Sequence, residues 1–76
     1  MTKHESKFVD LSLNIALYRK RKGLTQENLA ELVNVSRTHI SKIEARYVHT
    51  SLSLEKLFDI ADALDVPPAK LLELRE

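Results

Sequence analysis

The stretch from Ser36 to Ala45 carries polar side chains that could contact the edges of nucleic-acid bases. We expect Ile40 and Ile43 to point inward. At 100° per residue, a helix then places Thr38 and Lys42 on the opposite side. Arg or Lys can pair with guanine, and a Thr methyl group can pack against that of thymine. The pattern predicts four base contacts, by Arg37, Thr38, Lys42 and, at the edge of this face, His39. The alternative is that these side chains only solvate the helix.

Other residues that could perform catalysis do not form a recognisable site. The histidines His4, His39 and His49 lie at spacings that share no helix face, and no HExxH or similar ligand pattern occurs. The carboxylates of residues 55–76 follow an i, i+3 spacing that is typical of a solvated surface. Cysteine is absent, which excludes thiolate nucleophiles, disulfides and Cys-based zinc sites. We therefore expect no enzyme, no cofactor and no metal site.

The length of 76 residues is enough for one domain, which we expect to span residues 1–76. A chain of this size buries only about 60% of the surface that its unfolded state exposes, which leaves no room for a deep substrate cleft. The polar start does not resemble a signal peptide, and no run reaches the roughly 20 apolar residues of a membrane span. A soluble cytoplasmic protein without a membrane partner is expected.

The net charge of +1 conceals an uneven distribution of charge. Residues 1–49 hold nine Lys or Arg and five acidic residues, a net charge of +4. Residues 50–76 hold three basic and six acidic residues, a net charge of −3. A basic half is suited to a polyanion such as DNA. Charge alone does not separate this interpretation from an ordinary scatter of surface charge.

Five helical segments are expected to position these residues, because the chain has one Gly, two Pro and few runs of β-branched residues. Hydroxyl side chains at Thr25, Ser36 and Ser53 are predicted to cap three of them. Gly23 and Asn34 can adopt the left-handed conformation that ends a helix. The segments run from about Lys7 to Arg21, from Thr25 to before Asn34, from Ser36 to about Ala45, from Ser53 to Leu64 and from Val66-Pro67-Pro68 to Leu72.

Apolar residues recur at helical spacing in these segments and define the expected core. They are Phe8, Leu11, Ile15 and Tyr18 in the first segment; Leu29, Ala30 and Val33 in the second; Ile40 and Ile43 in the third; Leu54, Leu57, Phe58, Ala61 and Leu64 in the fourth; and Leu71 and Leu72 in the fifth. The first segment also carries a second apolar stripe of Val9, Leu13 and Leu17. Residues before Lys7, another subunit or a partner protein could cover that stripe.

The spacing in the middle of the chain fits a DNA-reading pair of helices. With Gln26 as position one, the small Ala30 is fifth and allows a close approach of the second helix. Asn34 is ninth, where a left-handed residue is needed. Ile40 and Ile43 are fifteenth and eighteenth, where apolar side chains fix the angle between the two helices.

From Gln26 to Ala45 the sequence thus reads as a helix-turn-helix, and it resembles the Cro/C1-type regulators, also called the XRE family. The resemblance covers about residues 11–72. It rests on Asn14-Ile15, Arg19, Gly23-Leu24-Thr25-Gln26, Leu29-Ala30, Val35-Ser36, Ile40-Ser41, Ile43-Glu44 and Ser53 to Leu72. It implies an all-α, compact five-helix, lambda-repressor-like fold. It also implies a transcriptional regulator, such as a repressor, that places its third helix in the major groove of double-stranded DNA.

The resemblance implies roles for further polar residues. Gln26 would bind a phosphate, and Arg19 would form a structural salt bridge with Glu44. Thr25 and Ser36 are expected to act mainly as caps, with phosphate contact as a second use. Ser41, Arg46 and Tyr47 could also contact phosphates, and an ordinary surface role is equally consistent with each of them. The segment SRTHISKIE is similar to that of restriction–modification controller proteins.

One recognition helix reads few base pairs, so a homodimer on an inverted-repeat operator is expected. The resemblance places the dimer contact at the C-terminal helix, where Leu72 and Leu74 are available and Val66 or Pro67 could contribute. The alternative interface is the stripe of Val9, Leu13 and Leu17, which would also suit a protein partner. The alternative function is therefore an antitoxin or another protein-interaction module with the same fold.

Overall fold

The computed structural model describes residues 3–45 and 51–75 of the chain. Within these ranges it contains five α-helices and no strand, which confirms the predicted all-α class. The helices are α1 (Glu5–Arg21), α2 (Gln26–Leu32), α3 (Arg37–Glu44), α4 (Leu54–Leu64) and α5 (Pro68–Leu71). Among the described helices, none combines the length and the apolar character that crossing a membrane requires.

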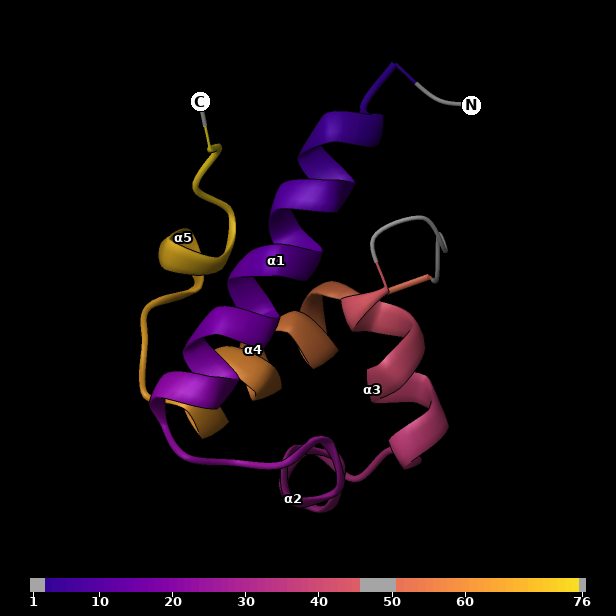
Figure 1. Cartoon of the computed structure of the whole chain (residues 1–76), viewed down its shortest axis with the longest axis vertical. Coiled ribbons are helices and arrows are strands. Elements are labelled where there is room, and N and C mark those ends of the chain that lie inside the picture. Colours follow the sequence, from indigo (N-terminus) through magenta and orange to yellow (C-terminus); the bar gives the residue numbers. More distant parts are fainter. Residues whose placement is uncertain (1–2, 46–50, 76) are drawn as a thin grey trace.

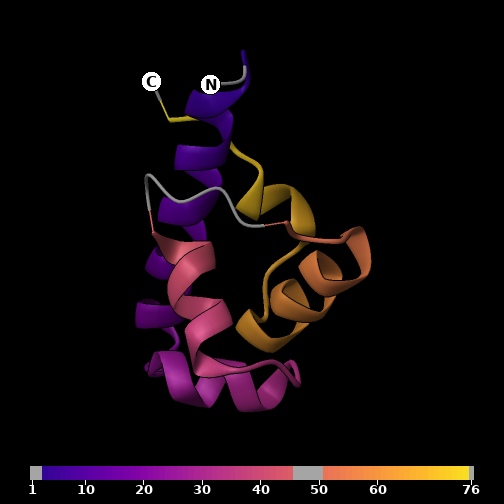
Figure 2. The same cartoon turned by 90° about the vertical axis from the view of Figure 1, so that its right-hand side faces the viewer.

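The long helix α1 runs along the long axis of the molecule, and the other helices pack around one of its ends (Figure 1). The short helix α2 closes that end, and α3 and α5 lie on opposite sides of α1. Seen from the side, α3 and α4 both stand above α2, on different sides of the molecule (Figure 2). The first turns of α1 extend beyond the other helices. This arrangement leaves one long side of α3 at the surface.

Each helix contributes one large side chain to the centre of the core. The largest fully buried side chains are Ile15, Leu29, Ile40, Ile60 and Leu71, which come in chain order from α1 to α5. Burial of such a side chain contributes about 1.5–3 kcal/mol to folding. The helices are therefore held around a single apolar cluster that also includes Ala30, Val33, Ile43, Leu57, Ala61 and Leu64.

The predicted core was wrong at three positions, since Phe8, Leu54 and Phe58 are 45–69% exposed. Leu72, for which the core and a dimer contact were alternatives, is 54% exposed and lies outside the core. Phe8 lies in the first turn of α1, and Leu72 follows the last residue of α5.

The fourth helix shows why periodicity alone failed there. Its buried residues are Leu57, Ile60, Ala61 and Leu64, a continuous stripe at spacings of three and four. Phe58 lies about 100° to the side of Leu57 on a helical wheel, outside this stripe. Leu54 is the first residue of the helix. Ile60, which was not predicted, takes the central position instead.

The predicted caps and turns are present as hydrogen bonds and backbone angles. The side chains of Thr25, Ser36 and Ser53 accept the backbone N–H groups at the third positions of α2, α3 and α4, respectively. Gly23 has φ +79° and Asn34 has φ +59°, both in the left-handed region. The turn between α2 and α3 thus needs a residue that tolerates positive φ, and Asn is a non-glycine residue that does so.

The C-terminal segment is tied to α1 by the buried side chain of Asn14. Its Nδ2 donates to the carbonyls of Leu71 (3.0 Å) and Glu73 (2.8 Å), and its Oδ1 accepts from Nε of Arg75 at 2.8 Å. The backbone N–H of Arg75 also donates to the Asp10 carboxylate at 3.0 Å. Residues 72–75 are therefore fixed in place along α1.

Candidate nucleic-acid interface

One face of α3 is polar and exposed along its whole length. Arg37, Thr38, Ser41 and Lys42 are exposed, whereas Ile40 and Ile43 are buried against the core. The helix has eight residues, or about two turns, and its exposed polar residues and its buried apolar residues lie on different sides of it. Arg37 begins the helix and Lys42 lies in its last turn, so cationic groups stand at both ends of the exposed face.

His39 does not belong to this exposed face. It is half-buried and lines a hollow of about 340 Å³ between α3 and α4, together with Val35, Leu52 and Lys56. The helical position that directs His39 toward α4 also directs it away from Thr38 and Ser41. His39 therefore lies at the edge of the exposed face, one helical turn before Lys42 and away from Thr38.

Glu44 at the end of α3 accepts hydrogen bonds from two other helices. Its Oε2 lies 2.7 Å from Nε of Arg19, and its Oε1 lies 3.0 Å from Nη2 of the same guanidinium. Nε2 of Gln26 donates to Oε1 at 3.1 Å. The Arg19 and Glu44 side chains are 10% and 5% exposed, respectively. This two-pronged ion pair joins α1 to α3, and Gln26 joins α2 to both.

Two backbone carbonyls complete this junction. Nη1 of Arg19 donates to the carbonyl of Leu24 at 2.7 Å, and Oγ of the buried Ser12 donates to the carbonyl of Ile43 at 2.8 Å. Carbonyls at a helix C-terminus lack intrahelical partners, so Ser12 satisfies one of them for α3. Sequence reasoning missed Ser12, because a serine within a helix gives no signal of the distant carbonyl that it binds.

The candidate phosphate-binding side chains occupy several different environments. The hydroxyls of Thr25 and Ser36 already accept a backbone N–H, but each retains an O–H that can donate to a phosphate oxygen. Gln26 uses one of its two N–H donors on Glu44 and retains the other. Ser41 is exposed on α3. The other two candidates, Arg46 and Tyr47, lie outside the described residues.

The candidate residues for protein contacts are apolar and are exposed or half-buried. Leu72 and Leu74 are 54% and 55% exposed on the segment that Asn14 fixes. Val9, Leu13 and Leu17 are half-buried on α1 and lie outside the core cluster. Among residues 3–45 and 51–75, no three His, Asp or Glu side chains are grouped to hold a metal ion.

Known protein families and solved structures resemble this chain over most of its length. A helix-turn-helix family model, HTH_3, matches residues 15–71. The HTH-type transcriptional regulator SlrR of Bacillus subtilis (strain 168) is 42% identical over 59 residues, which cover 78% of this chain. The match spans only 38% of the length of SlrR.

Two solved structures have the same arrangement of helices. The restriction-modification controller protein C.AhdI of Aeromonas hydrophila matches with a TM-score of 0.82 and 30% identity, over 92% of this chain and 99% of C.AhdI. SinR of Bacillus subtilis, a master regulator for biofilm formation, was solved in complex with DNA. It matches with a TM-score of 0.75 and 35% identity, over 83% of this chain and 98% of that one.

Substitution of Glu44 by Ala is expected to lower the free energy of unfolding by about 3–5 kcal/mol, because it leaves the Arg19 guanidinium buried without a counter-charge. Urea denaturation followed by circular dichroism measures this loss. Glu31→Ala is the matched control, since it removes an exposed carboxylate from α2 and should change stability by no more than about 0.5 kcal/mol. Equal stability of the two variants would show that the ion pair is dispensable.

Proposed function

Since the chain belongs to the helix-turn-helix family of DNA-binding transcriptional regulators, we propose that it inserts α3 into the major groove of a specific double-stranded operator. One observation carries this proposal. The exposed polar face of α3, with Arg37, Thr38 and Lys42, is fixed to the rest of the fold by the buried Arg19–Glu44 pair. A rigid helix with accessible donors is what direct readout of base edges requires.

In this proposal the two helices of the motif have different roles. Arg37 and Lys42 donate hydrogen bonds to base edges, and the methyl group of Thr38 contacts thymine. His39, directed toward α4, contributes less. Gln26, Thr25 and Ser36 donate to phosphates through the hydrogen atoms that they retain, which sets the position of α3 along the groove.

The exposed leucines of the C-terminal segment support a homodimer on an inverted repeat. Half-sites read by such dimers lie one helical turn apart, about 34–36 Å. Leu72 and Leu74 are exposed, and Asn14 and Asp10 hold their segment in place. Because the pairing surface is ordered in the monomer, dimerisation would cost less conformational entropy.

A narrower role, that of a restriction–modification controller, is supported by the match to nearly the whole of C.AhdI. An antitoxin or another protein-binding role is the second candidate function. It is favoured by Val9, Leu13 and Leu17, which form an apolar stripe on α1 outside the core. The two candidate functions share the helix-turn-helix fold and differ in the binding partner, which is DNA for the controller and a protein for the alternative.

Selection of bound duplexes from a random pool, followed by titration at several salt concentrations, tests DNA binding directly. We expect one enriched half-site in two inverted copies. If the dimer neutralises about 6–10 phosphates, the affinity should fall by roughly 10³–10⁵ between 50 and 200 mM salt. A protein-interaction module would give no enriched sequence and no measurable affinity for duplex DNA.

The division of roles predicts different outcomes for Arg37→Ala and Gln26→Ala. Loss of a base contact at Arg37 should cost about 1–3 kcal/mol on the selected operator and relax the preference at one or two base pairs. Loss of a phosphate contact at Gln26 should weaken selected and scrambled duplexes to the same extent, provided that an unchanged free energy of unfolding shows that loss of its bond to Glu44 leaves the junction intact. Titration of both variants against both duplexes separates the roles. An unchanged ratio of affinities in Arg37→Ala would remove Arg37 from the readout.

The proposed dimer predicts that Leu74→Glu weakens self-association by at least about tenfold, because it places a charge in an apolar contact. Leu13→Glu serves as the comparison, since it alters the α1 stripe instead. Sedimentation equilibrium of the wild type and of both variants measures the dissociation constant of the dimer. If Leu13→Glu dissociates the dimer and Leu74→Glu does not, the interface lies on α1.

A further inference from the structure

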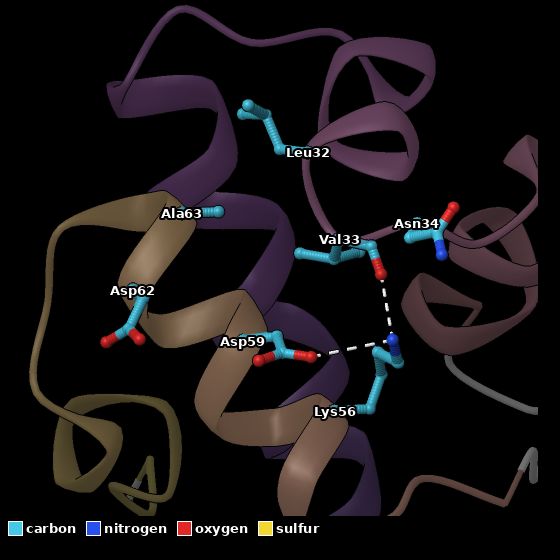
Figure 3. A pocket seen from close by; sticks show the side chains of 7 residues that line it. All are labelled: Leu32, Val33, Asn34, Lys56, Asp59, Asp62 and Ala63. Carbon is cyan, nitrogen blue, oxygen red and sulfur yellow. Dashed lines mark hydrogen bonds and ion pairs between the residues drawn. The ribbon is translucent and has the colours of Figure 1, made fainter.

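A lysine on α4 contacts the turn of the helix-turn-helix. Nζ of Lys56 donates to the backbone carbonyl of Val33 at 2.8 Å, and Val33 is the residue that ends α2. The same ammonium lies 3.5 Å from the carboxylate of Asp59, one turn further along α4. Figure 3 shows the Lys56 side chain reaching from α4 to the Val33 carbonyl, beside Asn34.

The carbonyl of Val33 stands at a point where the backbone changes direction. The N–H groups of Val33, Asn34 and Val35 return to the carbonyls of Leu29, Glu31 and Ala30, respectively. These bonds close the last turn of α2 but leave the Val33 carbonyl pointing out of it. Asn34 then takes φ +59°, and the chain leaves toward α3. A carbonyl at a helix end needs a partner from elsewhere, and a cation there also interacts favourably with the helix dipole.

The geometry favours the turn over Asp59 as the important partner of Lys56. The Lys56 side chain is only 28% exposed, and its bond to Val33 is 0.7 Å shorter than its distance to Asp59 (2.8 and 3.5 Å). Asp59 is itself 45% exposed, so solvent screens the ion pair. The hydrogen bond to Val33 is charge-assisted and partly buried, the kind that contributes most.

The hollow beside Lys56 does not account for the contact. It has a volume of about 540 Å³ and is lined by α2, the turn and α4, with Leu32, Asp62 and Ala63 among its residues. In Figure 3 the ammonium is directed to the Val33 carbonyl at its edge. The lysine therefore acts as a link between two segments of the chain.

We propose that Lys56 is a positioning residue for DNA recognition, which fixes the turn between α2 and α3 by holding the Val33 carbonyl. It touches no base or phosphate itself. Its effect on operator binding rests on the proposed function, because a loosely held turn would let α3 change its angle to α2. Phosphate contacts tolerate such a change better than base contacts, which need an accurate fit.

Amide hydrogen exchange without DNA tests the link itself. In Lys56→Met, which keeps an apolar stem but lacks the ammonium, the Val35 N–H should exchange about 5–10 times faster relative to Ile15 in the core. Asp59→Asn is the matched control, because it removes the ion pair and leaves the bond to Val33. Lys56→Arg retains a donor and should restore most of the protection. Unchanged exchange at Val35 in Lys56→Met would overturn the proposal, whatever the protein binds.

Operator titration of the same variants tests the consequence for recognition. Lys56→Met should bind the selected operator about tenfold more weakly, should lose little affinity for scrambled duplex and should keep the salt slope. Asp59→Asn should match the wild type. A salt slope reduced by about one would instead indicate a direct phosphate contact and overturn the proposal. Faster exchange with unchanged discrimination would equally overturn the positioning role. If the wild type bound no duplex, the proposed function would fail, while the exchange result would still decide the link.

Discussion

The carboxylate of Glu44 lies where three helices meet, and the guanidinium of Arg19 balances its charge there at 2.7 Å. Both side chains are almost completely removed from solvent, which is costly for ions. The cost is offset only when each polar atom has a partner. Arg19 donates to Glu44 and to the Leu24 carbonyl, and Glu44 also accepts from Gln26. The pair therefore tolerates little change in the relative position of α1, α2 and α3.

This constraint explains how so small a fold can present a rigid surface. Each helix gives the core one large fully buried side chain, and apolar contact holds the helices together without regard to direction. Hydrogen bonds supply the missing direction. The Arg19–Glu44 pair and the bond from Ser12 to the Ile43 carbonyl both end on the last residues of α3. These bonds at the C-terminal end of α3 thus fix the direction in which its exposed face points.

Much of this fold could be predicted from local patterns in the sequence. The spacing of Ala30, Asn34, Ile40 and Ile43 predicted the two motif helices and the left-handed turn, because each position has a steric requirement that few residue types meet. Periodicity also gave the buried face of α2 and α3, but in α4 it placed Leu54 and Phe58 inside and missed Ile60. It could not show where a neighbouring helix ends, which is why Phe8 was wrongly placed in the core.

Bonds from a side chain to a distant backbone carbonyl were not predictable, because the acceptor is common to every residue and leaves no trace in the sequence. Ser12, Asn14 and Lys56 make such bonds across 31, 57 and 23 positions of the chain, respectively. Their acceptors share a location, since all three carbonyls lie at the C-terminal end of a helix: Ile43 in α3, Leu71 in α5 and Val33 after α2. Short helices expose a larger fraction of their carbonyls than long ones. The short helices α2, α3 and α5 have four to eight residues each. The hydrogen-bond donors for the carbonyls at their C-terminal ends therefore come from the long helices, α1 and α4.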